Sequence, residues 1–275
     1  VGTADEVLFT MMTPRRHPKN PILSPELASE GQFVTPYAVL WNEAKKVFQL
    51  WYGVVHFERG EELQYPAYAE SRDGLDWSRP VLNLVEFNGS KANNLIPNGG
   101  LVIRDDHDPD PSRRYKVVGC GGDARSVTLS FSSDGVTDWK SSPRNPLFTN
   151  TGDTHALFGW DERLQKYIGF FRPMGKRPHS PVRQQQRHIA VSFSDDGDSW
   201  SPMVPVLVPD DHDPPGTEFY RVAAVRYEDL FIGLLQVLHM DAGLLDFHQP
   251  DPVGVEQTVD TQLVVSRDAV NWARV

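Results

Sequence analysis

The sequence predicts an all-β fold made of repeated four-stranded units, and three observations point to it. Glycine (21) and proline (22) together make up roughly one residue in six of the 275, which argues against a helical bundle because both residues break a chain into short elements. Aromatic residues reach 11% and include seven tryptophans, a composition that suits the packing of sheets. The third and strongest observation is an internal repeat.

A short motif, Ser-x-Asp-Gly followed shortly by Trp, recurs four times at intervals of 61, 62 and 72 residues, with Ala269 in place of the glycine in the fourth copy. One such motif would carry little information, whereas four at a nearly constant period indicate structural repetition. Asp-Gly supplies a tight turn between two strands, and the Ser and Asp side chains are able to hydrogen-bond the turn backbone. We therefore interpret these aspartates as structural. The four copies occupy residues 71–77, 132–139, 194–200 and 266–272.

Each repeat indicates four antiparallel strands. A hairpin and a third strand, rich in β-branched and aromatic residues, precede every motif, and a proline-marked segment that suits an edge strand follows three of them. Radial repetition of such sheets is the β-propeller arrangement. The predicted hairpin strands are 34–41 with 47–55, 101–104 with 115–120, 156–160 with 167–171, and 219–227 with 230–238. The predicted third strands are 65–71, 126–132, 188–194 and 262–266, and the outer strands are 80–85, 143–148 and 202–208.

Further motifs give this repeat a family resemblance. They lie at residues 19–23, 68–77, 85–94, 106–116 and 215–220. In their order they resemble the five-bladed propeller glycoside hydrolases of families 32, 43, 62 and 130, and most closely bacterial proteins with a family 32 N-terminal domain. The resemblance covers nearly the whole chain. It implies a five-bladed β-propeller of which about four blades are present, a single domain over 1–275 with repeats ending near 85, 148, 208 and 275, and a carbohydrate substrate.

The two ends of the chain raise the question of how the propeller closes. Residues 18–23 match 143–148, so they predict the outer strand of a blade whose other strands come from elsewhere in the chain. They would either complete the fourth blade, whose own outer strand is expected to be cut off after Trp272, or belong to a fifth blade beyond Val275. We expect the second arrangement, with the chain truncated at its C-terminus and lacking part of its channel wall.

Composition excludes several classes of function. The formal charge of −10 disfavours binding to nucleic acids and to anionic membranes, and no apolar run is long enough to span a bilayer. The single cysteine, Cys120, allows neither an internal disulfide nor a thiolate metal cluster. The glycines at 119–122 lack the Gly-Lys-Ser/Thr of a phosphate loop. The Asp-Asp-His-Asp-Pro segments at 105–109 and 210–214 occupy different places in their repeats. We therefore predict no metal and no cofactor, and localisation stays open.

Glycoside cleavage needs two carboxyl groups, and the resemblance implies a third acid that orients the sugar and tunes the general acid. Glu218 opens the fourth inner strand ahead of an apolar run, and a partly buried carboxyl group there suits general acid catalysis. Asp153 opens the third inner strand and is predicted as the base or nucleophile. Asp105 follows the second inner strand and resembles the aspartate of the family's Arg-Asp-Pro motif, although Asp106 stands in place of the proline. We predict it as the third acid.

Substrate-binding residues are predicted around these acids. His155 shares the strand face of Asp153, and Tyr220 shares that of Glu218. Arg172, Arg187 and His239 lie at the ends of inner or second strands, where they are able to contact hydroxyl or carboxylate groups of a sugar. The families carry an aspartate on the first inner strand, which is missing here, and Glu30 is the nearest acid that would replace it. This departure keeps a non-catalytic carbohydrate-binding propeller open, and a glycoside phosphorylase with Arg172 or Arg187 on its phosphate is a further alternative.

Overall fold

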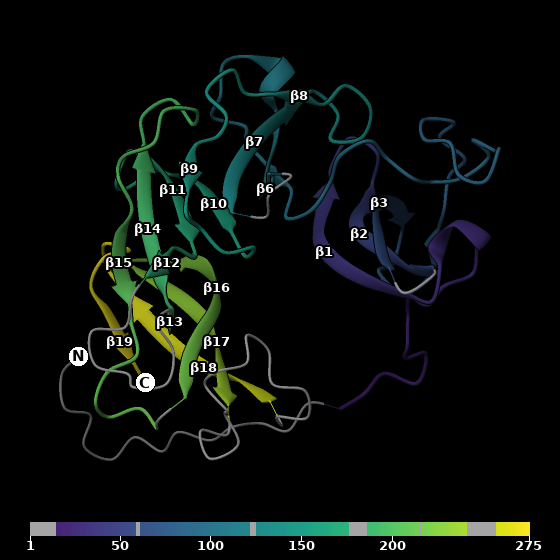
Figure 1. The fold of residues 1–275 in the computed structure, drawn as a ribbon. Helices are drawn as coiled ribbons and strands as arrows, with labels where there is room; N and C mark the ends of the chain where they lie inside the picture. The colour runs from purple at the N-terminus through teal and green to yellow at the C-terminus, as the bar shows by residue number, and fades with distance from the viewer. Residues whose placement is uncertain (1–14, 59–60, 122–124, 176–185, 215, 241–256) are drawn as a thin grey trace.

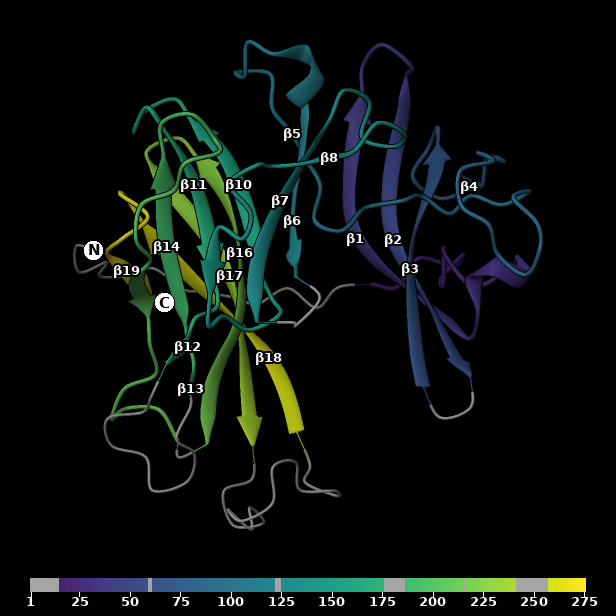
Figure 2. The ribbon, with the colours of Figure 1, turned by 45° about the horizontal axis from the view of Figure 1, so that its top comes forward.

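The structure, a computed structural model, describes residues 15–58, 61–121, 125–175, 186–214, 216–240 and 257–275. Their regular secondary structure is almost entirely strand, with two short 3-10 helices at Ala28–Glu30 and Pro111–Arg113. Four antiparallel sheets follow one another in chain order as blades of a propeller-like ring (Figure 1). Turning the molecule in Figure 2 shows the same succession of blades around a common centre. The all-β prediction and the presence of four blades are confirmed.

Every blade has four strands. The first contains β1 (Phe33–Asn42), β2 (Val47–Glu58), β3 (Glu61–Ser71) and β4 (Trp77–Ser78). The second contains β5 (Ile103–Arg104), β6 (Tyr115–Cys120), β7 (Ser126–Ser132) and β8 (Lys140–Ser141), with β9 (Phe148–Thr149) also paired to β7. The third contains β10 (Ala156–Asp161), β11 (Lys166–Phe171), β14 (Ile189–Ser194) and β15 (Val204–Leu207). The fourth contains β16 (Thr217–Tyr227), β17 (Leu230–Met240), β18 (Gln257–Ser266) and β19 (Trp272–Arg274).

The predicted outer strands need correction. The outer strands of the first two blades are β4 and β8, which begin at or just after the motif tryptophan; residues 80–85 form no strand, and of residues 143–148 only the last belongs to one. The fourth blade is also complete, because Trp272 itself begins its outer strand β19. The short motif turn returns the chain directly into the outer strand, so no proline-marked segment is needed there. Only the outer strand predicted in the third repeat agrees with the structure, as β15.

The repeated motifs act as turns. In the first, Asp73 accepts hydrogen bonds from the backbone N–H groups of Leu75 and Asp76 at 2.8 and 2.9 Å, and Ser71 Oγ accepts one from Gly74. Asp134, Asp196 and Asp268 bind their own turns in the same way. The backbone N–H groups of Asp76 and Leu75 lower the pKa of Asp73 to about 2. These aspartates are therefore structural.

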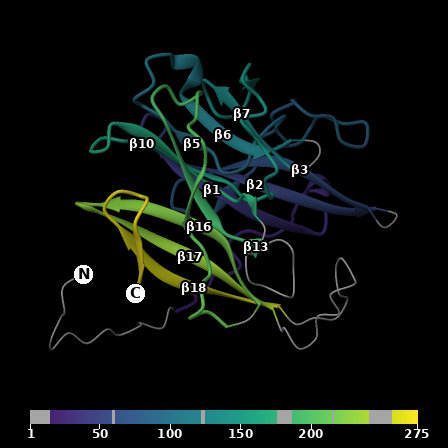
Figure 3. The ribbon, with the colours of Figure 1, turned by 60° about the vertical axis from the view of Figure 1, so that its left-hand side comes forward.

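Apolar cores join consecutive blades. Trp51 and Val117 belong to the core between the first and second blades, and Leu129 and Phe171 to the one between the second and third. The third and fourth blades share a core around Phe231. The other face of the fourth blade, whose strands β16, β17 and β18 are seen in Figure 3, exposes apolar residues. They are Val225, Leu234, Val259 and Leu263, which are 62%, 53%, 54% and 40% exposed.

Residues 18–23 form a turn rather than the predicted strand. The turn resembles its sequence match, because Asn20 N–H donates to His17 O as Asn145 N–H donates to Ser142 O. Lys19 Nζ lies 2.7 Å from Asp76 in the first-blade motif, as Arg144 lies near Asp198 in the third-blade motif. Residues 18–23 thus contact the motif of the first blade in the way that residues 143–148 contact the motif of the third blade. Among the described residues it does not pair with β18, and a fifth blade stays a prediction.

The turn aspartates can be tested with two neighbouring residues. Replacing Asp196 by Ala removes the acceptor of two backbone N–H groups, so we expect the free energy of unfolding to fall by about 1–2 kcal/mol. Asp195→Ala removes only an exposed ion pair with Lys166 and is the control, with a loss below about 1 kcal/mol. Urea unfolding measures both, and equal losses would contradict the structural role of the motif.

Candidate functional site

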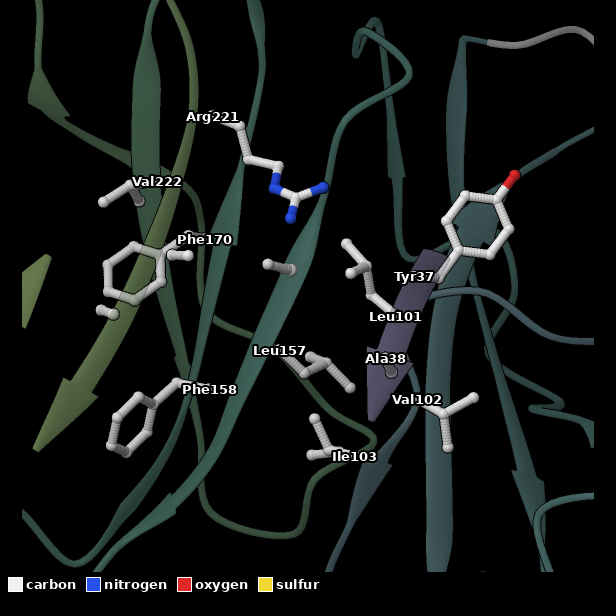
Figure 4. Close-up of a pocket in the computed structure, with 13 residues that line it drawn as sticks. Tyr37, Ala38, Leu101, Val102, Ile103, Leu157, Phe158, Phe170, Arg221 and Val222 are labelled. Carbon is white, nitrogen blue, oxygen red and sulfur yellow. The ribbon is translucent and has the colours of Figure 1, made fainter. Parts of the chain in front are cut away.

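The inner strands of the four blades line one cavity of about 230 Å³ at the centre of the ring (Figure 4). Each blade contributes to its wall, with Tyr37 on β1, Val102 just before β5, Leu157 on β10 and Arg221 on β16. Three of these strands carry a β-bulge at an aromatic residue, namely Tyr37, Phe158 and Tyr220. A bulge redirects the side chains of its strand, so the wall of the channel is irregular where these strands surround it.

Two ion pairs meet at the end of the channel where β10 and β16 begin. Asp153 precedes β10 and pairs with Arg172, and Glu218 on β16 pairs with Arg187. The two guanidinium groups lie 4.8 and 5.8 Å from the centroid of the Tyr220 ring. The structure therefore brings both predicted carboxylates to one channel mouth, together with Tyr220 and both arginines. We call these five residues the mouth cluster.

The local strands explain how the arginines reach the mouth. Arg172 follows the last residue of β11, which pairs with β10. Arg187 lies in β13 (Gln186–Arg187), which forms a small hairpin with β12 (Met174–Gly175) between β11 and β14. The hairpin lies close to β16, so its arginine reaches Glu218 on the neighbouring blade.

The two carboxylates differ in their contact with water. The side chain of Glu218 is 3% exposed, and that of Asp153 is 60% exposed. A buried carboxylate next to a solvated one provides the two different environments that general acid and base chemistry requires.

Arg172 is buried and only partly satisfied. Its Nε and Nη1 atoms have no hydrogen-bond partner among the described residues. Burial lowers the pKa of Arg172, and the charge of Arg187 lowers it further. Gly152 makes room for this side chain, since a Cβ at that position would collide with the Arg172 Nε atom. Both nitrogen atoms are enclosed by the protein, so a ligand at the mouth would reach them only if the Arg172 side chain shifts.

His155 lies beneath Arg172 rather than in the open mouth. Its Nδ1 atom is 3.5 Å from the Arg172 backbone nitrogen, and its buried Nε2 atom has no hydrogen-bond partner among the described residues. Burial lowers the pKa of His155 to about 4, so the imidazole is neutral at pH 7. His239, in contrast, lies opposite Thr217 in the β16–β17 pair, and its Nε2 is 2.9 Å from Asp260. Within the described ranges it flanks the mouth and makes no hydrogen bond or ion pair with the mouth cluster.

Asp105 does not join the other two acids. It follows the last residue of β5, and its backbone N–H donates to Arg114 O across the β5–β6 turn. Its carboxylate lies 2.6 Å from the buried Lys116 Nζ and also interacts with Tyr167, which pairs with Trp160 near the far end of β10. The ten residues from Asp105 to Tyr115 connect the end of β5 to the start of β6, whereas Asp153 precedes the start of β10. Asp105 therefore lies at the opposite end of the channel from Asp153. The predicted grouping of Asp105 with Asp153 and Glu218 therefore does not hold, and its buried pair with Lys116 suits a structural role.

Glu30 is likewise engaged in the structure of the first blade. Its carboxylate accepts hydrogen bonds from the Tyr52 hydroxyl at 2.5 Å and from Arg79 Nε at 2.7 Å, and from two backbone N–H groups. Burial opposes its ionisation, but these donors outweigh it and hold the pKa of Glu30 below its usual value. The side chain is fully buried and leaves no acceptor free for a sugar. Glu30 does not replace the missing first-blade aspartate.

The first two blades contribute different groups near the mouth. Tyr37 and Asn98 line a second cavity of about 410 Å³ between these blades, and Tyr37 also borders the central cavity.

Within the described ranges no cluster of three metal-binding side chains occurs, and none of the helices there has the length and apolarity needed to span a bilayer. In the Asp-Asp-His-Asp-Pro segments, Asp105 and Asp108 bind Lys116, and Asp213 binds Arg274.

Sequence analysis missed Arg221 and Tyr37. Arg221 is the single charged residue within the apolar run 219–225, and that contrast was the available signal. Tyr37 follows Pro36 in a strand where the family resemblance points to an acid rather than to an aromatic residue. The place of each residue on the channel wall depends on a β-bulge in its strand. The type of the residue alone does not indicate this place.

Comparisons with known proteins bear on this geometry. No protein-family model matches the sequence, and no curated protein matches it significantly. Solved structures do match. A complex of BT0996 with RGII is 14% identical with a TM-score of 0.58, and the match covers 92% of this protein and 75% of that one. A β-fructofuranosidase from Schwanniomyces occidentalis with fructosyl-erythritol is 14% identical with a TM-score of 0.57, covering 92% and 46%. A β-1,2-mannobiose phosphorylase from Listeria innocua is 11% identical with a TM-score of 0.51, covering 94% and 95%.

The chain has the fold of the propeller glycosidases. At these levels of identity the likeness concerns the fold alone. The chain spans three quarters of the first of these structures, less than half of the second and nearly all of the third. A propeller glycosidase fold supports many activities, so the function has to be argued from the site itself.

The structural role of Asp105 is testable through its partner. Lys116→Met leaves the buried carboxylates of Asp105 and Asp108 without their shared cation, and we expect the free energy of unfolding to fall by about 3–5 kcal/mol. Lys166→Met breaks only an exposed pair and should cost less than about 1 kcal/mol. Denaturant unfolding measures both, and a Lys116→Met loss as small as that of the control would refute this assignment.

The buried imidazole predicts a pH dependence of stability. The pKa of His155 is about 4 in the folded protein and about 6.5 in the unfolded chain, so the unfolded state binds the proton more readily. The contribution of the neutral imidazole to the free energy of unfolding is complete above pH 6.5. It is lost as the pH falls toward 4, which lowers the free energy of unfolding by about 3 kcal/mol. Between pH 7 and pH 4, the free energy of unfolding should therefore fall more for the wild type than for His155→Gln. Equal falls would contradict a buried neutral imidazole.

Proposed function

We propose that this protein is a carbohydrate-active enzyme that cleaves a glycosidic bond at the channel mouth, with Glu218 and Asp153 as its two carboxyl groups. One observation carries the proposal. The two carboxylates come from neighbouring blades, share one cluster of arginines around Tyr220, and differ sharply in exposure. Glycoside hydrolysis requires two carboxyl groups in unlike surroundings on either side of the bond that is cut.

Glu218 suits the general acid. Its side chain is 3% exposed, and burial away from water is the setting in which carboxyl groups serve as general acids. Its partner Arg187 is half-buried and comes from a hairpin with two-residue strands, so this pair opens more easily than the pair of the buried Arg172. A sugar that takes hydrogen bonds from Arg187 would release Glu218 to carry the proton.

Asp153 suits the base or nucleophile. Its side chain is 60% exposed to water and is paired with Arg172. The ring of Tyr220, against which both guanidinium groups lie, adds an aromatic surface to the mouth, of the kind on which the apolar face of a sugar packs.

Phosphorolysis is the second candidate, because Arg172 keeps two buried N–H-bearing atoms unpaired beside Arg187. Paired guanidinium groups bind phosphate oxygens well. In this reaction phosphate attacks the anomeric carbon, the glycosidic bond breaks, and the leaving oxygen takes the proton of Glu218. The products would be a sugar phosphate and the shortened glycan.

The test is a screen of aryl glycosides and natural glycans, with and without inorganic phosphate. We expect the wild type to cleave at least one of them and Glu218→Gln to lose about 10²–10⁴-fold in rate, the usual contribution of a general acid. Glu228→Gln, at the opposite end of the same strand hairpin, is the control and should retain full activity.

The outcomes separate the alternatives. Activity that depends on phosphate identifies phosphorolysis, and activity without it identifies hydrolysis. Undiminished cleavage by Glu218→Gln would remove Glu218 from the chemistry. Binding of glycans without any cleavage would leave a carbohydrate-binding propeller.

A further inference from the structure

Arg221 differs from the other arginines that are withdrawn from water. Among the described residues, every other buried or half-buried arginine has a carboxylate partner. These are Arg79, Arg113, Arg114, Arg172, Arg187 and Arg226. Arg221 is half-buried, and within the same ranges it has neither an ion pair nor a hydrogen bond. Its positive charge is left without a counter-charge from the part of the chain that the structure describes.

The β-bulge in β16 is what directs this side chain into the channel. In a regular strand Phe219 and Arg221 would share a face, since side chains alternate. Here Phe219 and Val222 are the two residues that enter the core between the third and fourth blades. Tyr220 and Arg221 therefore both lie away from that core. Figure 4 shows the Arg221 guanidinium extending from β16 into the central cavity.

The cavity offers Arg221 little to bind. Its wall is mostly apolar, with Ala38, Val102 and Leu157 among the lining residues. Burial lowers the pKa of Arg221, which is the expected consequence of desolvating an unpaired cation. Burial likewise raises the pKa of Tyr37, so that its phenol stays a neutral hydrogen-bonding group. An unpaired guanidinium in apolar surroundings is costly unless a ligand supplies the anion.

We propose that Arg221 binds the carboxylate of an acidic sugar unit, a uronic acid, in the central cavity. This assignment rests on the proposed function, because it names the substrate class of the same channel. The planar guanidinium is suited to bidentate recognition of a carboxylate. The cavity of about 230 Å³ is smaller than the ~300–1,000 Å³ of pockets for drug-sized ligands, which suits one sugar ring.

The position along β16 gives the order of the subsites. Arg221 is three residues beyond Glu218, or about 10 Å along the strand. The acidic unit would therefore lie deeper in the channel than the bond that is cut at the mouth.

The experiment compares binding of matched glycans by calorimetry. The probes are uronic acid oligosaccharides from pectin, alginate and glucuronoxylan, each with its carboxyl-reduced counterpart, and glucose 1-phosphate as a second source of an anion. We expect the wild type to bind at least one acidic glycan about 10–100-fold more tightly than its reduced form, as for a hydrogen-bonded charge pair. Arg221→Gln should bind both forms alike, with the affinity of the wild type for the reduced form.

Two controls keep the result interpretable. Arg267→Gln replaces an exposed arginine in the motif turn of the same blade and should keep the full preference. Arg221→Gln removes an unpaired charge, so its thermal midpoint should be no lower than that of the wild type. Arg221→Lys, which keeps the charge but not the bidentate geometry, should show an intermediate preference.

Three results would overturn the assignment. They are equal affinity of the wild type for acidic and reduced glycans, a preference that survives in Arg221→Gln, and tighter binding of glucose 1-phosphate than of any uronic acid glycan. Each of these leaves the proposed cleavage at the mouth intact. Failure of the wild type to bind any carbohydrate would instead refute the proposed function, and this assignment with it.

Discussion

The site depends on the contact of two arginine–carboxylate pairs with the ring of Tyr220. Arg172 and Asp153 belong to the third blade, and Glu218 and Tyr220 to the fourth, while Arg187 crosses between the two blades on a small hairpin. The contact therefore joins two blades at the channel mouth and fixes both carboxylates relative to one another. Without the arginines, the buried Glu218 would have no compensating charge and Asp153 no anchor.

Ion pairs serve a different purpose at the other end of the channel. Lys116 donates to Asp105, Asp108 and the carbonyl of Arg113, so that all three of its N–H bonds are used. Such a closed network stabilises the β5–β6 turn and leaves nothing for a ligand. At the mouth, by contrast, two nitrogen atoms of Arg172 stay without hydrogen bonds, and deeper in the channel Arg221 has no partner among the described residues. The binding role that we propose for the mouth and the channel rests on this contrast between the two ends.

Much of the fold was predictable because the repeat carries it. The turn of each motif, the hairpin before it and the order of the four blades follow from patterns that occur in all four repeats. A copy that is hard to interpret alone is therefore interpreted by comparison with the other three. The shared location of Asp153 and Glu218 was predictable because each lies near the start of an inner strand that the sequence marks clearly. Asp105 was misplaced because β5 has only two residues, so the sequence does not show whether an adjacent acid begins or ends the strand. Glu30 and Arg221 depend on contacts far apart in the chain, and on a bulge, which no local pattern reveals.

The most direct measurement is a crystal structure of the protein with a bound glycan. The account predicts a sugar at the end of the channel where β10 and β16 begin, packed on Tyr220 and hydrogen-bonded to Arg172 or Arg187, with its glycosidic oxygen next to Glu218. A glycan bound at the opposite end, against Asp105 and Lys116, would contradict the central claim that the mouth cluster is the functional site.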